Sequence, residues 1–82
     1  MMRRETFAIK DIYVPVKRRA TVKPTIVKEI AQSILESGQQ TPIRVRRDGK
    51  RYVLVEGLHR LEACKALGEE TIFGYLVQAA KH

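Results

Sequence analysis

Hydrophobic and polar positions follow two different periods along the chain, and each period predicts its own kind of element. Residues 7–14, FAIKDIYV, are β-branched and aromatic in partial alternation and stop at Pro15, which predicts a first strand. The following segment, residues 15–24, is basic and has a proline at each end, so we interpret it as a loop.

A helix is predicted between Pro24 and Gly38, because proline fits the first turn of a helix and glycine is typical of a helix C-terminus. The apolar residues of this segment recur at helical spacing. They would form one stripe that comprises Ile26, Val27, Ile30, Ala31, Ile34 and Leu35. The positions between them are polar and are expected to face solvent.

Residues 42–57, PIRVRRDGKRYVLVEG, contain two strand-like runs around an Asp-Gly pair, which is among the stronger short signals for a hairpin. Ile43 and Val45 would share one face of the first strand, and the arginines next to them would share the other. The second run, YVLVE, is apolar on both faces. It therefore predicts a strand in the middle of a sheet.

From His59 to Leu67 the pattern is helical again, with apolar residues three apart and Gly68 as the C-terminal stop. The apolar positions are Leu58, Leu61, Cys64 and Leu67, with Ala63 and Ala66 in close contacts. Residues 71–77, TIFGYLV, predict a last strand, and residues 79–82 a frayed tail. The order β-α-β-β-α-β predicts a small α+β fold, with a mixed sheet and two main helices, in a single domain.

The composition narrows the function classes. The chain has 16 Lys and Arg against 9 Asp and Glu, a net charge of +7, which favours polyanions such as nucleic acid and nucleotides. Cys64 is the one cysteine, so an internal disulfide and a cysteine zinc site are excluded and a cytoplasmic setting is expected. No apolar run is long enough to span a bilayer, so we expect no membrane partner.

Candidate chemistry lies in residues 53–68, where a buried strand is predicted to pass into a helix. Gly57 would permit a tight turn, so free N–H groups and the positive end of the helix dipole would point to one spot, which suits a phosphate. Arg60 would grip two phosphate oxygens, and His59 would donate to a third. A plain turn, with a surface histidine and an arginine over the core, fits the same residues.

A second candidate surface is the hairpin, where five basic residues cluster: Arg44, Arg46, Arg47, Lys50 and Arg51. They would follow a nucleic-acid backbone without reading bases. A solvated strand face is the alternative, because no aromatic residue is interleaved with them for stacking.

The pattern S-I-x-x-x-G-x-x-x-P-I-x-V-R, followed by Y-x-L-x-x-G-x-x-R-x-x-A, runs through the centre of the chain. It is matched by Ser33, Ile34, Gly38, Pro42, Ile43, Val45, Arg46, Tyr52, Leu54, Gly57, Arg60 and Ala63. With the order of elements, it resembles the ParB/sulfiredoxin superfamily, and specifically the N-terminal ParB-like domain of partition proteins. The resemblance covers nearly the whole chain.

The resemblance implies a site for a nucleoside triphosphate, CTP or ATP, with Mg²⁺. The implied phosphate loop is Gly57, Leu58, His59 and Arg60, with Gln40 and Thr41 near the base or ribose and Arg18 or Arg19 near the phosphates. It also implies a role in chromosome or plasmid partition or in DNA-linked regulation, with non-specific DNA contacts and a homodimer or larger assembly.

The chain departs from the partition proteins within this loop. Those proteins usually show G-E-R-R-x-R-A, whereas residues 57–63 read GLHRLEA and lack the acid and two of the arginines. This departure puts CTP hydrolysis in question and leaves a weak NTPase activity open. The family's second phosphate motif, Glu-Asn-x-Gln-Arg, and its helix-turn-helix do not occur in residues 1–82, so a piece of a longer protein and a stand-alone module both stay open.

The form G-x-H-R is closer to sulfiredoxin and to the free-serine kinases of the same superfamily, which couple ATP to phosphoryl transfer. The reactive cysteine of sulfiredoxin would stand at Leu58, so that activity is not expected, and Cys64 is interpreted as a small buried hydrophobe with a raised pKa. Glu56 would act as a catalytic base or hold Mg²⁺. Alternatively, it would pair with Arg60 or Lys65 at the end of its strand.

The other acids are scattered, so neither nuclease activity nor a metal site formed by the protein is predicted. Three hypotheses remain. The first is a ParB-like nucleotide-binding module, the second an ATP-dependent phosphotransferase, and the third a non-catalytic scaffold that contacts DNA or a partner through its basic hairpin.

Overall fold

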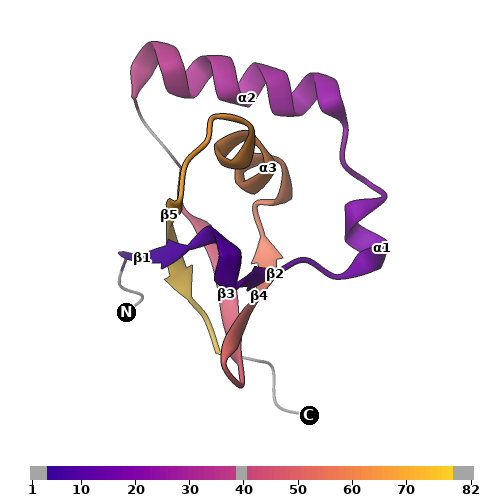
Figure 1. The fold of residues 1–82 in the computed structure, drawn as a ribbon, viewed down its shortest axis with the longest axis vertical. Helices are drawn as coiled ribbons and strands as arrows, with labels where there is room; N and C mark the ends of the chain where they lie inside the picture. The colour runs from indigo at the N-terminus through magenta and orange to yellow at the C-terminus, as the bar shows by residue number, and fades with distance from the viewer. Residues whose placement is uncertain (1–3, 39–40, 79–82) are drawn as a thin grey trace.

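The computed structural model describes residues 4–38 and 41–78. The elements in chain order are β1 (Arg4–Ala8), a 3₁₀ helix η1 (Ile9–Asp11), β2 (Ile12–Tyr13), α1 (Val16–Arg19), α2 (Pro24–Ser37), β3 (Ile43–Asp48), β4 (Arg51–Glu56), α3 (Leu58–Ala66) and β5 (Thr71–Leu76). The five strands form one mixed sheet in the order β1-β5-β3-β4-β2, and α3 lies between this sheet and α2 (Figure 1). The predicted α+β fold with two main helices is confirmed.

The prediction of one strand over residues 7–14 is wrong, because η1 divides the segment and sends its halves to opposite edges of the sheet. Four residue steps from Ala8 to Ile12 span at most about 14 Å. The edge strands of a flat five-stranded sheet would be about 19 Å apart. The sheet must therefore be strongly curled. The sequence signal was a break in alternation at Lys10 and Asp11, where the burial pattern changes phase.

The predicted loop over residues 15–24 is also partly wrong, because four of its residues form α1. The N–H groups of Arg18 and Arg19 both donate to the carbonyl of Pro15, at 2.9 and 3.2 Å. This short helix holds two arginines beside the sheet in a defined position.

The helix predicted between Pro24 and Gly38 is confirmed as α2, with Gly38 as its C-cap. Ile34 is buried, and Val27, Ile30 and Ala31 pack against the core. Leu35, in contrast, is 73% exposed, so its place in the buried stripe was wrong. The apolar stripe is narrower than the sequence suggested, because α2 contacts the rest of the protein mainly through α3.

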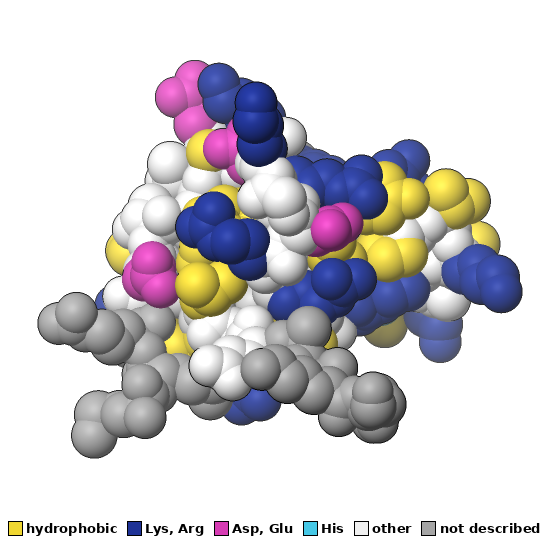
Figure 2. Space-filling model, turned by 90° about the horizontal axis from the view of Figure 1, so that it is seen from below, with side chains coloured by type: hydrophobic (Ala, Val, Ile, Leu, Met, Phe, Trp, Pro, Cys, Tyr) yellow, Lys and Arg dark blue, Asp and Glu magenta, His cyan; other side chains and the backbone are white. Residues whose placement is uncertain are grey.

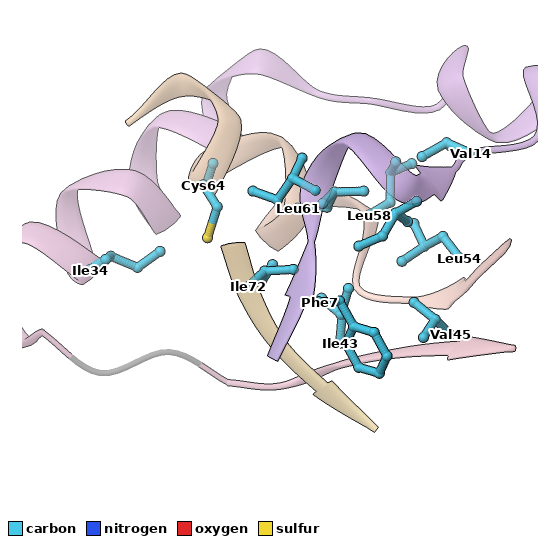
Figure 3. Close-up of a cluster of buried hydrophobic side chains, with 13 residues drawn as sticks. Phe7, Val14, Ile34, Ile43, Val45, Leu54, Leu58, Leu61, Cys64 and Ile72 are labelled. Carbon is cyan, nitrogen blue, oxygen red and sulfur yellow. The ribbon is translucent and has the colours of Figure 1, made fainter. Parts of the chain in front are cut away.

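α3 begins at Leu58, one residue earlier than predicted, and supplies the centre of the core. Leu58, Leu61, Ala63 and Cys64 are buried. They belong to one cluster with inward side chains of the strands such as Phe7, Ile43 and Ile72, and Figure 3 shows Leu58, Leu61 and Cys64 among them. Burial raises the pKa of the Cys64 thiol above its ordinary value, and the nearby Glu69 carboxylate raises that pKa further. The interpretation of Cys64 as a buried hydrophobe is confirmed.

The hairpin is formed by β3 and β4, with its two-residue turn at Gly49 and Lys50. β4 lies between β3 and β2, as expected of an interior strand, although Val55 is 42% exposed. The last strand is confirmed as β5, and the predicted frayed tail lies outside the described residues. No helix in residues 4–38 or 41–78 is both long and apolar enough to cross a membrane.

Candidate functional site

One close contact determines the turn between β4 and α3. Gly57 is the N-cap of α3 and has φ = +104°. Residues other than glycine rarely adopt this backbone conformation. A Cβ atom on Gly57 would lie 2.6 Å from Cγ2 of Ile43 and 3.3 Å from its Cα. The backbone of the turn is therefore held against the first residue of β3, and only glycine fits there.

The first turn of α3 has no anionic group that would offset the helix dipole. No side chain caps the helix, and no acidic residue lies in its first turn. The Leu61 N–H donates to the Gly57 carbonyl at 2.9 Å, so the N–H groups of residues 58–60 precede the ladder of helical hydrogen bonds. Leu58 is only 6% exposed, so its apolar side chain belongs to the core and not to a ligand site.

His59 makes a contact that the sequence did not predict. Its Nε2 accepts a hydrogen bond of 3.0 Å from the backbone N–H of Lys23, the N-cap residue of α2. An accepting Nε2 leaves the proton of a neutral imidazole on Nδ1. His59 therefore joins the N-termini of α2 and α3, and only Nδ1 can donate to a phosphate.

Arg60 is half-buried in the same turn. It forms no hydrogen bond or ion pair with another residue in the described ranges 4–38 and 41–78. Its positive charge lowers the pKa of Cys64 and so opposes the larger effect of burial. No group in the described part of the chain thus occupies the donors of the Arg60 guanidinium.

α1 brings Arg18 to the end of β4, next to the Gly57 turn. Nη1 of Arg18 donates to the carbonyls of Leu54 and Val55, at 3.1 and 2.8 Å. These two residues come shortly before the turn in the chain, so Arg18 lies close to residues 57–60, and its contact with a phosphate stays a prediction.

The remaining residues that the resemblance assigned to the nucleotide site lie in different places. Arg19 donates from Nε to the Val14 carbonyl at 2.9 Å, and its guanidinium lies 5.6 Å from the ring centroid of Tyr13. It therefore does not share the carbonyl contacts of Arg18. Thr41 is exposed two residues before Ile43, at the end of β3 that contacts the Gly57 turn, whereas Gln40 lies outside the described residues.

Glu56, the candidate base, has a basic partner, but a different one from those predicted. Its carboxylate lies 3.4 Å from Nε of Arg44, its neighbour across the hairpin. Lys65 instead lies 3.2 Å from Glu62. In residues 4–38 and 41–78 no group of three His, Cys, Asp or Glu side chains could hold a metal ion. A Mg²⁺ ion would therefore depend on phosphate oxygens more than on protein carboxylates.

Four of the five basic residues of the hairpin are in three different environments. Arg44 and Arg51 have carboxylate partners, with Arg51 3.3 Å from Asp48. Arg46 is half-buried on β3. Lys50 is exposed in the turn. The positive charge of the hairpin is therefore partly neutralised.

Arg47 shows that aromatic rings do lie among the hairpin arginines. Its Nη2 donates to Oη of Tyr52 at 3.0 Å, and its guanidinium lies 5.1 Å from that ring centroid. Arg51 lies 4.1 Å from the ring centroid of Tyr13. The interpretation that no aromatic residue is interleaved with these basic residues was wrong, because Tyr52 of β4 lies beside Arg47 and β2 brings Tyr13 alongside β4.

A family model and a related protein place this chain in the same protein family. A family model of the ParB N-terminal domain matches residues 3–82. The chain is 34% identical over 62 residues to a probable chromosome-partitioning protein ParB of Campylobacter jejuni, a match that covers 76% of this chain and 22% of that protein.

Two solved structures share the fold. Sulfiredoxin from Arabidopsis thaliana superposes with a TM-score of 0.82 at 30% identity, over 94% of this chain and 86% of that one. A C-terminally truncated chromosome-partitioning protein ParB from Caulobacter crescentus, complexed with CTP-gamma-S, gives a TM-score of 0.79 at 23% identity, over 95% of this chain and 46% of that one. The chain thus spans only part of the partition proteins that it matches.

Proposed function

Because the chain belongs to the ParB N-terminal domain family, we propose that it binds the phosphates of a nucleoside triphosphate at residues 57–60 and acts in DNA partition or DNA-linked regulation. The CTP-gamma-S complex of the Caulobacter protein makes CTP the first ligand to test. Since the chain spans only part of its relatives, the DNA site, the dimer and the activity of the whole protein belong to the same proposal.

The observation that carries the proposal is an uncapped helix N-terminus beside an arginine that has no hydrogen-bond or ion-pair partner among residues 4–38 and 41–78. Gly57 presses the turn against Ile43, so the N–H groups of residues 58–60 are held in place before a ligand arrives. A phosphate there would meet the positive end of the helix dipole. Arg60, in the first turn of α3, and Arg18, beside the end of β4, would supply charge-assisted hydrogen bonds.

Mg²⁺ enters this proposal as a companion of the triphosphate. Magnesium sites of nucleotide-binding proteins commonly combine phosphate oxygens and water with one or two carboxylates. Glu56 is the carboxylate next to the turn, but it is engaged with Arg44. It would have to leave this exposed ion pair to reach the metal.

A thermal-shift assay with CTP, ATP and GTP, each with Mg²⁺, tests the site directly. A ligand that binds only the folded state at 100 times its Kd adds ~2.7 kcal/mol of stability. For a domain of this size, that corresponds to a rise in Tm on the order of 10 °C. We expect such a rise with CTP, and we expect Arg60→Ala to weaken binding roughly 10- to 100-fold by removing hydrogen bonds to a charged group.

Lys10→Ala is the charge control, because it removes one exposed positive charge from η1, which bonds to Glu70 beyond the C-terminus of α3, and it should leave the nucleotide shift unchanged. A rise in Tm with ATP alone would move the proposal towards phosphotransferases. If no nucleotide changes the Tm, or if Arg60→Ala shifts as much as the unmodified protein, the phosphate site is refuted.

The similarity to sulfiredoxin supports a second candidate, an ATP-dependent phosphotransferase of that branch. It is the weaker of the two, because the position implied for the reactive cysteine is a buried leucine and Glu56 is ion-paired. This candidate requires ADP formation with a small acceptor and loss of that activity in Glu56→Gln. The third hypothesis, a non-catalytic scaffold, requires that neither ligand binding nor ADP formation is observed.

A further inference from the structure

The face of the sheet away from the core carries a second set of chemical groups, on β5 in particular. Side chains alternate along a strand, so the burial of Ile72 at 1% exposure places Phe73 and Tyr75 together on the opposite face. Phe73 is 40% exposed. α2 and α3 lie on the other side of the sheet (Figure 1), so these helices leave the outer face uncovered.

Arginines flank both rings on this outer face. Arg4 of β1 and Arg44 of β3 are the cross-strand neighbours of Tyr75 on its two sides. The guanidinium of Arg4 also lies 4.6 Å from the ring centroid of Phe73. Two aromatic rings, two residues apart on one strand, therefore sit in a row with arginines on either side.

The pattern continues across β3, β4 and β2. Val45 is fully buried, so Arg46 faces outward, opposite Val53, and Tyr13 is the neighbour of Val53 on β2. Arg51 covers the Tyr13 ring. Three of the five aromatic residues of the chain thus share the outer face with four arginines. Seen from the side away from α2, Lys and Arg side chains are spread over the surface with hydrophobic side chains exposed among them (Figure 2).

The charge of this face is positive on balance. Arg44 and Arg51 are offset by Glu56 and Asp48. Arg4 and Arg46 have no ion-pair partner among residues 4–38 and 41–78. The face therefore complements a polyanion that also offers flat apolar surfaces.

We propose that the outer sheet face binds single-stranded nucleic acid, with bases stacked on Phe73 and Tyr75 and backbone phosphates at Arg4 and Arg46. Unpaired bases expose the π-faces that an aromatic ring on a sheet can stack against, whereas the bases of a duplex already stack on one another. A positive surface with the exposed ring of Phe73 and the half-buried ring of Tyr75 is therefore selective for single strands. This site is separate from the nucleotide turn and does not depend on it.

Fluorescence anisotropy with a labelled oligothymidylate of about 12 nucleotides, against a duplex of equal length, tests the proposal. We expect the single strand to bind more tightly, and Phe73→Ala and Tyr75→Ala each to weaken that binding on the order of tenfold. Arg46→Ala should reduce the slope of log K against log salt by about 0.7, the change for one phosphate contact on a single strand.

Leu35→Ala is the matched control for Phe73→Ala, because it truncates an exposed apolar side chain on α2 and should bind as the unmodified protein does. Phe73→Tyr keeps the ring and should retain binding. In the unmodified protein, saturation with the oligonucleotide should quench tyrosine fluorescence, a readout that needs no variant. Equal affinity for duplex or polyglutamate, unaltered binding by Phe73→Ala, or absence of quenching would each overturn the proposal.

Discussion

The two ends of β4 are both reached through a glycine with positive φ, yet they are built differently. At Gly49, in the hairpin turn, φ is +63° and an added Cβ would meet no atom within 4 Å. At Gly57 the same atom would overlap Ile43. A glycine in the sequence predicts a turn in both places. Only the surrounding residues decide whether the turn has room for a side chain at that position.

The two ends of β4 also differ in whether their arginines have partners within the protein. At the hairpin end, Arg51 and Arg47 are engaged with Asp48 and Tyr52, and these contacts are exposed. At the other end, Arg18 and Glu56 also have partners, but Arg60 has no hydrogen-bond or ion-pair partner in the described part of the chain. A rigid backbone with an unpaired cation favours a small anionic ligand, whereas the hairpin resembles an ordinary solvated turn.

The largest difference between the two ends should appear on replacing their glycines. Gly57→Ala combines the cost of positive φ with a steric overlap against buried Ile43, and we expect it to lower the free energy of unfolding by about 3 kcal/mol. Gly49→Ala bears the conformational cost alone, about 1 kcal/mol. Urea denaturation of both variants measures the difference, and equal losses would show that the Ile43 contact does not constrain the turn.

A smaller effect is expected from the hydrogen bond that joins the two helix N-termini. His59→Ala removes the acceptor of the Lys23 N–H and should cost about 1 kcal/mol in the free energy of unfolding. Arg47→Ala removes an exposed hydrogen bond at the hairpin end and should cost less than about 0.5 kcal/mol.

His59→Gln sharpens this comparison, because its amide oxygen can still accept and should restore part of the loss. Urea denaturation again gives the values. If His59→Ala is as stable as the unmodified protein, the histidine does not link α2 to α3.

The smallest effect is expected from the ion pair across the hairpin. Glu56→Gln removes the charge opposite Arg44, but both side chains are largely exposed, at 69% and 47%. The free energy of unfolding should therefore change by less than about 0.5 kcal/mol. Thermal melts at low and high salt measure the change, and a loss above about 1 kcal/mol would show that Glu56 holds the end of β4 in place.

Much of the local structure was predictable because it is encoded in neighbouring residues. Pro24 and Gly38 mark the two ends of α2. The Asp-Gly pair predicts the hairpin, and the apolar spacing after Gly57 predicts α3. The glycine turn was predicted together with Arg60 as its cation. The contact of Gly57 with Ile43 was not, because these residues are brought together only by the pairing of β3 with β4.

The sequence by itself thus determined the two main helices, the hairpin, the last strand and the residues of the turn, since helical and strand periods act over a few residues. Only the tertiary structure decided that the first strand divides between the two edges of the sheet, that Glu56 pairs with Arg44, and that His59 binds Lys23. It also gathered Tyr13, Phe73 and Tyr75 on one face. The physical reason is that sheet order and register join distant segments, and a shift of one residue would move every side chain of a strand to the other face.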